Sequence, residues 1–339
     1  MVVEYEISTP FVTPHAILGE GPAYVPSTNE LYFVDVIQKQ LKSVALIPET
    51  EELRLSPSVT HPEAPPVEVF APSIEYIHTT QFKEPVTVLA LTPSSPKEFL
   101  VGAQHGFAIA RPGDENLEYK VNVYKHDADK HDRLRFNDGN VDPSGRFLAG
   151  TMINNLEHDG IEDIGTLFAL ELDGSVRSLF DGCSIPNGLQ FSDDGTTMFH
   201  SDSPTKTVWV YDYDVDTGVA SNKRALFEVD GDGAVPDGLT ISAQGDLFVA
   251  IWGGHRVEQR DSLTGQLKAI FKFPARNVTC PTFGGKDLDS LFVTTASLEE
   301  ADRNAWSEKE SHYDLGGEVF RFKVPGHVGV PRGIYKGTL

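Results

Sequence analysis

The sequence is poor in three features that mark common protein classes: long apolar runs, cysteine and positive charge. No stretch approaches the roughly 18 consecutive apolar residues that a membrane-spanning helix needs. Residues 1–10 also lack the basic and apolar regions of a signal peptide. We therefore expect a soluble, cytoplasmic protein that does not bind membranes.

Cysteine and basic residues are scarce enough to exclude further classes. The two cysteines, Cys183 and Cys280, are too few for a disulfide framework or a thiolate zinc site, so we expect inert buried thiols. Against 28 Lys and Arg stand 50 Asp and Glu, and the resulting formal net charge of −22 repels nucleic acid. Nothing in the sequence indicates an obligate protein partner.

What the sequence does contain is a repeat. Short apolar runs, each preceded by turn-forming Gly, Asp, Ser or Asn residues, recur about every 50 residues. The runs are residues 31–36, 99–103, 147–152, 198–203, 247–252 and 291–296. This period, with several short strands per copy, is typical of a β-propeller, in which each copy forms one antiparallel sheet. We predict an all-β, six-bladed propeller in which residues 1–339 form a single domain.

The first interval of the repeat is longer than the others. Its residues 44–73 are rich in Pro, Glu and Ser and have no sustained helical period. We predict an inserted loop at about residues 44–84 in the first blade, exposed at the surface. The alternative is a flap over one end of the propeller.

A second loop, residues 125–133, mixes Asp with His. Its spacing lacks the Gly and the distal Glu of an EF-hand, so we predict a solvated charged turn. For His105 we predict a structural or surface position.

Polar side chains occur at one phase of four repeats, ten or eleven residues before the apolar run. They are Glu20, Asn137, Asn187 and Asp237. The innermost strand of each propeller blade lines the central channel, so equivalent positions point to equivalent places around it. Asn-Gly and Asp-Gly are common hairpin turns, but Glu20 lies in no such turn. We therefore favour a convergent oxygen cluster for a hard cation such as Ca²⁺ or Mg²⁺, with Mn²⁺ and Zn²⁺ as alternatives.

A positively charged side chain accompanies one of these amides. Arg135 precedes Asn137 by two residues, so strand alternation sends both side chains to the same face. A metal, a guanidinium and an amide together suit an oxygen-rich small molecule that is anionic or polyhydroxylated. The alternative is structural: Arg135 pairs with Asp138 or Asp142 and holds a blade together.

Five segments together resemble the family of regucalcin, gluconolactonase and luciferin-regenerating enzyme, the senescence-marker-protein-like lactonases. They are 19-GEGPAY-24, 135-RFNDGNVDPSGRFLAGTM-152, 186-PNGLQFSDDGTTMFHSDS-203, 236-PDGLTISAQGDLFVA-250 and 282-TFGGKDLDSLFVTTA-296. The resemblance implies a six-bladed propeller with one divalent metal at the channel mouth, and Ca²⁺ is our first expectation. It implies Glu20, Asn187 and Asp237 as metal ligands, and Arg135 and Asn137 as substrate-binding residues.

The chain departs from the animal members of this family at one position. They have a carboxylate shortly after Gly-Thr-Met, where this chain has Asn155. We expect Asn155 to take that place in the substrate site, so the resemblance does not fix the substrate preference.

The resemblance implies hydrolysis of a sugar lactone. We expect Asp237 to be the catalytic residue, a metal ligand that also accepts a proton from the attacking water. A serine esterase is not indicated, because the sequence has no G-x-S-x-G motif. The alternatives are a metal-dependent hydrolase of other esters or organophosphates, and a non-catalytic calcium-binding propeller.

Overall fold

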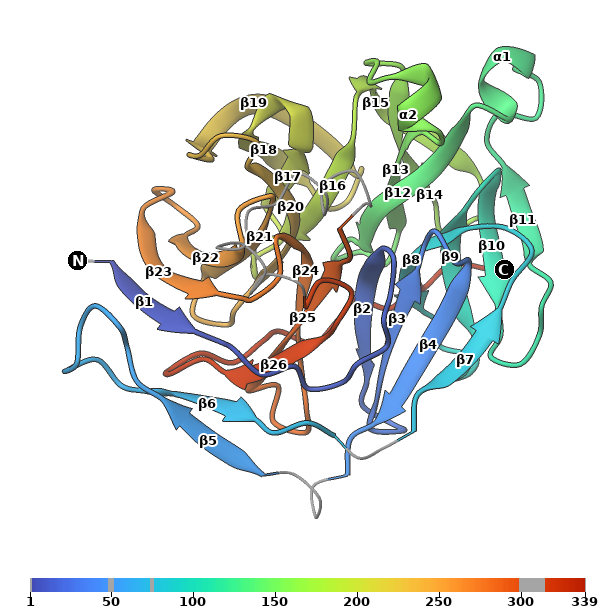
Figure 1. Cartoon of the computed structure of the whole chain (residues 1–339). Coiled ribbons are helices and arrows are strands. Elements are labelled where there is room, and N and C mark those ends of the chain that lie inside the picture. The colour runs from blue at the N-terminus through green and yellow to red at the C-terminus, as the bar shows by residue number, and fades with distance from the viewer. Residues whose placement is uncertain (1, 48–51, 74–75, 299–314, 339) are drawn as a thin grey trace.

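The structure is a computed structural model that describes residues 2–47, 52–73, 76–298 and 315–338. Figure 1 shows short strands gathered into sheets around a central axis. The helices α1 (Ala128–His131) and α2 (Leu156–Asp159) are single turns in loops between strands. None of the described helices has the length and apolar character that a membrane crossing requires.

The described strands form six sheets around the ring, which confirms the predicted six-bladed β-propeller. Four of the blades have four strands each, and the chain runs from the channel outwards. The first has β2 (Gly19–Val25), β3 (Glu30–Asp35), β4 (Gln40–Ala45) and β7 (His78–Gln81). The second has β8 (Val86–Leu91), β9 (Phe99–Ala103), β10 (Gly106–Ala110) and β11 (Glu118–Asn122). The third has β12 (Leu134–Val141), β13 (Phe147–Ile153), β14 (Gly165–Leu170) and β15 (Val176–Cys183).

The fourth blade has β16 (Pro186–Phe191), β17 (Thr197–Asp202), β18 (Thr207–Asp214) and β19 (Val219–Glu228). The last two blades have five strands, because each gains strands from the N-terminal part of the chain. The fifth has β20 (Val235–Ile241), β21 (Asp246–Trp252), β22 (Arg256–Asp261), β23 (Leu267–Lys272) and β1 (Val3–Glu6). The sixth has β24 (Asn277–Gly284), β25 (Ser290–Ala296), β26 (Phe320–Lys323), β6 (Val67–Phe70) and β5 (Leu53–Ser56).

The segment expected to be an inserted loop has a different structure. Its residues 53–56 and 67–70 form a hairpin that pairs with β26 of the sixth blade, and residues 78–81 form the outer strand of the first blade. Figure 1 shows the pale-blue β5 and β6 beside the red β26. Residues 48–51 and 74–75 of this segment lie outside the described residues. The segment therefore joins two blades at their outer edges.

The hydrophobic core lies between blades. Each pair of neighbouring blades shares one cluster of buried apolar side chains. The first residue of each repeated apolar run is fully buried, and these residues are Leu31, Phe99, Phe147, Met198, Leu247 and Leu291. Burial of one such side chain contributes about 1.5–3 kcal/mol. The repeat therefore marks the second strand of each blade, which packs against both neighbouring blades.

The innermost strand of every described blade carries a β-bulge. Its pairing with the second strand shifts register at Glu20/Ala23, Val86/Val88, Phe136/Gly139, Pro186/Leu189, Pro236/Leu239 and Val278/Cys280. Bulges re-aim side chains and are frequent beside functional sites. The Asn-Gly and Asp-Gly pairs of β16 and β20 lie in these bulges and do not form hairpin turns.

The glycines in these pairs are required by packing. A Cβ atom on Gly188 would lie 2.6 Å from the backbone nitrogen of Leu239, and one on Gly238 would lie 2.6 Å from Cys280 Sγ. Each glycine therefore allows one innermost strand to approach the next across the channel wall.

Residues 325–338, which we call the closing segment, cross the propeller at the far end of the innermost strands. Their backbone bonds to four different blades, at Ala243, Leu288, Leu91 and Gly145. The Arg332 guanidinium donates to the carbonyls of Pro22 (2.9 Å) and Leu89 (2.8 Å), on the innermost strands of the first and second blades. The closing segment therefore ties blades together at the end of the channel away from Glu20 and Asn187.

Candidate metal and substrate site

The bulges bring together Arg135, Asn137 and Asn187, three of the predicted site residues. Arg135 Nη1 donates to Asn137 Oδ1 at 2.9 Å, and Asn137 Nδ2 donates to Asn187 Oδ1 at 2.8 Å. Arg135 and Asn187 are each 6% exposed. The shared face expected for Arg135 and Asn137 is therefore present, and it meets the fourth blade.

The ion pair on which the structural alternative for Arg135 depends does not form. Asp142 pairs with Arg146 at 2.9 Å, and no ion pair to Arg135 occurs among the described residues. Burial lowers the pKa of Arg135 to about 10, and the charge of Glu20 opposes this shift. Nε and Nη2 of Arg135 make no hydrogen bond within the described part of the chain, so these donors can reach a ligand.

Two of the expected metal ligands are carboxylates with little compensation for their charge. Burial raises the pKa of Glu20 to about 8, and the like charge of Asp138 adds to the rise. Burial also raises the pKa of Asp237 well above its usual range, with further contributions from Glu20 and Asp138. Asp237 is 4% exposed, and its Oδ1 has no hydrogen-bond partner among the described residues.

Asp138 is an acidic group of the channel that the sequence analysis missed. Burial raises its pKa to about 6, while the Gly139 amide and the Arg332 charge lower it in part. Simple alternation along β12 would send Asp138 to the face opposite Asn137. The bulge between Phe136 and Gly139 breaks that alternation and brings Asp138 near Glu20 and Asp237.

Ser203 is a second residue that the sequence analysis missed. It begins the short 3₁₀ helix η2 (Ser203–Thr205) directly after β17, and it is 4% exposed. Its Oγ accepts from Asn187 Nδ2 at 2.7 Å and donates to the Pro236 carbonyl at 2.7 Å. The antiparallel register of β16 and β17, which pairs Pro186 with Asp202, is the signal that could have placed Ser203 beside Asn187.

A cavity of about 360 Å³ opens at the other end of the channel, beneath the closing segment. Asp138, Cys280 and Arg332 line it, but the expected metal ligands do not. Burial raises the pKa of the Cys280 thiol well above its usual range, and that of Cys183 to about 12. Both cysteines are free and buried, as predicted.

Asn155 lies outside this group of side chains. It is the N-cap of α2, where its side chain accepts from the His158 amide at 3.2 Å, and it is exposed. No contact in the described structure joins it to Arg135 or Asn137. A role for Asn155 in substrate binding therefore stays a prediction.

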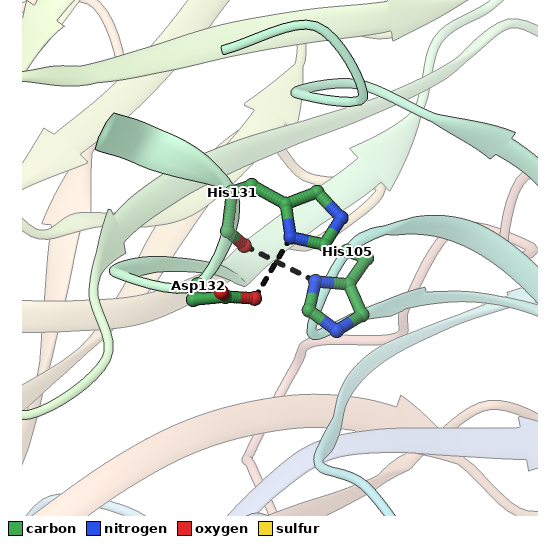
Figure 2. Close-up of side chains that lie close together, drawn as sticks. All are labelled: His105, His131 and Asp132. Atoms are coloured by element: carbon green, nitrogen blue, oxygen red, sulfur yellow. Dashed lines mark hydrogen bonds and ion pairs between the residues drawn. The ribbon is translucent and has the colours of Figure 1, made fainter. Parts of the chain in front are cut away.

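A separate cluster lies outside the channel, where the turn between β9 and β10 meets the end of α1, at His105, His131 and Asp132. Figure 2 shows the two imidazole rings one over the other beside the Asp132 carboxylate. The rings are 4.3 Å apart and nearly parallel, at 12°, and the possible ligand atoms lie within 4.8 Å of one another. A metal binds an imidazole in the plane of its ring. Two stacked parallel rings cannot direct their lone pairs at one ion, so this arrangement is a hydrogen-bonded stack.

The channel residues, in contrast, fit a divalent cation. Carboxylate and amide oxygens are the ligands that hard cations prefer, and Glu20, Asn187 and Asp237 offer both kinds. A buried carboxylate oxygen without a partner is costly unless a positive charge compensates it. Asp237 Oδ1 is such an atom.

These features define a class of protein: a six-bladed propeller with an acidic, oxygen-rich site where the innermost strands begin. Comparison with known proteins specifies the class further. Residues 18–297 match the model of the SMP-30/Gluconolactonase/LRE-like region. The chain belongs to this family, which confirms the resemblance inferred from the sequence.

Three relatives show how far the similarity extends. A Bacillus subtilis (strain 168) protein, named provisionally as the sugar lactone lactonase YvrE, is 31% identical over 86% of this chain and 88% of its own. Regucalcin of Gallus gallus is 32% identical over 93% of both chains. The solved structure of a luciferin-regenerating enzyme has a TM-score of 0.77 at 28% identity, over 95% of this chain and 96% of its own.

Proposed function

We propose that this protein is a divalent-metal-dependent hydrolase that opens a sugar lactone. One observation carries the proposal. The buried Asp237 carboxylate, whose Oδ1 has no partner among the described residues, lies near Glu20 and beside the hydrogen-bonded side chains of Arg135, Asn137 and Asn187. We assign Glu20, Asn187 and Asp237 as ligands of one cation. Ca²⁺ fits the all-oxygen donor set best, and Zn²⁺, Mn²⁺ and Mg²⁺ are the alternatives.

The side chains divide the chemistry among them. A cation bound there would supply Lewis acidity to the lactone carbonyl. Asp237 accepts a proton from the attacking water. The free Nε and Nη2 donors of Arg135 bind a ring hydroxyl or the carbonyl oxygen, and Asn137 holds the guanidinium in place through its Oδ1.

The test pairs metal analysis with an activity assay. The purified protein is analysed for bound metals and assayed with a pH indicator on a panel of aldonolactones, aryl esters and phosphate esters. The assay is repeated after chelation, and again after each cation has been added back. We expect lactone opening that disappears on chelation and returns with one cation.

Three other results would contradict this proposal in different ways. Lactone opening after complete metal removal would exclude the metal-dependent mechanism. Turnover of aryl or phosphate esters alone would replace the substrate class. Bound calcium without any hydrolysis would leave a calcium-binding propeller.

A further inference from the structure

A chain of consecutive hydrogen bonds runs across three blades of the channel. It begins at Arg135 and passes through Asn137, Asn187 and Ser203 to the carbonyl of Pro236, the residue before Asp237. Its links are 2.9, 2.8, 2.7 and 2.7 Å long. This hydrogen-bond chain therefore joins the third, fourth and fifth blades at the residues assigned to the site.

The two ends of this hydrogen-bond chain determine which group donates and which accepts in every bond. A guanidinium can only donate hydrogen bonds, and a backbone carbonyl can only accept them. The Ser203 hydroxyl must give its proton to Pro236, so its oxygen is left to accept from Asn187. The Asn187 amide must therefore turn its NH₂ towards Ser203 and its Oδ1 away from Ser203, to the side where it accepts from Asn137 Nδ2.

This direction matters because the two ends of an amide are not equivalent to a cation. The oxygen of Asn187 can bind a cation, whereas its NH₂ repels one. Partners in the outer shell of a metal site orient the ligands that touch the metal. We infer that Ser203 is a positioning residue of this site, which holds the Asn187 amide with its oxygen directed at the cation. This inference rests on the proposed metal site.

The test is a metal titration of Ser203→Ala against a matched control. Ser201 lies two residues earlier on β17, is fully buried, and has no hydrogen-bond partner for its Oγ among the described residues. Parent, Ser203→Ala and Ser201→Ala are stripped of metal and titrated calorimetrically with CaCl₂ and with MnCl₂. We expect Ser203→Ala to bind about 10- to 100-fold more weakly, and Ser201→Ala to bind like the parent.

The same substitution in an Asn187→Asp background separates loss of the amide orientation from a general loss of structure. In Asn187→Asp both terminal atoms are oxygens, so no amide direction remains to be set. Adding Ser203→Ala to Asn187→Asp should therefore weaken binding much less than it does in the parent background. Thermal unfolding of the metal-free variants reports any loss of folded protein independently.

The outcomes distinguish this inference from the proposed function. If the parent binds neither Ca²⁺ nor any other divalent cation, the metal site and the role of Ser203 are both wrong. If the parent binds a cation and Ser203→Ala binds it equally well, only the role of Ser203 is wrong. An equal loss in both backgrounds would show that Ser203 is structural.

Discussion

At the scale of single residues, the site depends on side chains held in the channel without their usual partners. Asp237 has no donor for its Oδ1, and Arg135 has no carboxylate at ion-pair distance among the described residues. Both groups are buried, so their interactions with a ligand are screened weakly by water. In the proposed function, a bound cation or substrate would compensate the cost of burying them.

We predict that Arg135→Ala lowers kcat/KM about ten- to hundred-fold, because a charged hydrogen bond to substrate contributes roughly 1.5–3 kcal/mol. Metal content should stay at the parental level, because Arg135 is not assigned as a ligand. Steady-state kinetics and metal analysis of the same preparation measure both. A variant that is largely unfolded, with normal activity per folded molecule, would show that Arg135 is structural.

We predict that Asp237→Asn lowers kcat about 10²- to 10⁴-fold at saturating metal, because an amide cannot act as the general base. Folding should survive, and metal should bind more weakly with one negative charge fewer. The reciprocal Asn187→Asp should change metal preference more than turnover at saturation. Parental turnover by Asp237→Asn at saturating metal would mean that Asp237 is only a ligand.

A third residue-scale prediction concerns acid stability. His200 is 2% exposed, and burial lowers its pKa to about 3 from an ordinary value of 6.5. Between these values the unfolded chain binds a proton that the folded chain does not. The stabilising effect of the neutral ring is therefore present above pH 6.5 and is lost as the pH falls towards 3, at up to about 1.4 kcal/mol per pH unit.

Urea unfolding at pH 7.5 and pH 5 measures this effect. We expect His200→Phe to lose less stability than the parent on acidification, by about 2 kcal/mol at pH 5. His158→Gln is the control, because the His158 side chain is 82% exposed. The same pH dependence in parent and His200→Phe would contradict the assignment.

At the scale of elements, the innermost strand with its bulge is the unit that makes the site. The position in the repeat predicted Glu20, Asn137, Asn187 and Asp237, because a bulge at the same place in every blade keeps equivalent positions equivalent. The bulge does, however, change the direction in which the side chains point. Asp138 was missed for that reason, since alternation along β12 points it out of the channel.

Long-range pairing limited the rest of the sequence analysis. The hairpin of residues 53–56 and 67–70 pairs with β26 through its second strand, and no local pattern indicates a partner so distant in the chain. Ser203 ends an apolar run that the repeat identifies only as a strand. Its contact with Asn187 needs the register between two strands, which the sequence alone did not establish.

The bulge glycines allow a test at this scale. We predict that Gly188→Ala costs about 1–3 kcal/mol of stability, because its Cβ would meet the Leu239 backbone at 2.6 Å and the Asp237 carbonyl at 2.8 Å. The shift of β20 should also weaken metal binding. Chemical denaturation and metal titration measure the two effects, and parental values in both would refute the packing argument.

At the scale of the whole molecule, the ring is held together by segments that cross from one blade to another. Arg332 is the clearest case, because its guanidinium bonds to carbonyls on the innermost strands of two blades. One planar fork serves both carbonyls, which a lysine ammonium at the same place would not do.

We predict that Arg332→Ala lowers the free energy of unfolding by at least about 1–3 kcal/mol, since it leaves buried carbonyls without a donor. Arg332→Lys should recover only part of the loss. Guanidinium chloride unfolding of the three proteins gives the comparison. Equal stability of all three would show that the closing segment contributes nothing through this side chain.

The sixth blade has a consequence for how the protein is made. Its outer hairpin, β5 and β6, leaves the ribosome long before β26, to which β6 bonds. Pairings between distant parts of a chain are slow to form and leave strand edges exposed meanwhile. The early hairpin must therefore remain with the edge of β6 unpaired until β26 has been synthesised. Ring closure, and with it the assembled channel, is thus a late event in the life of each molecule.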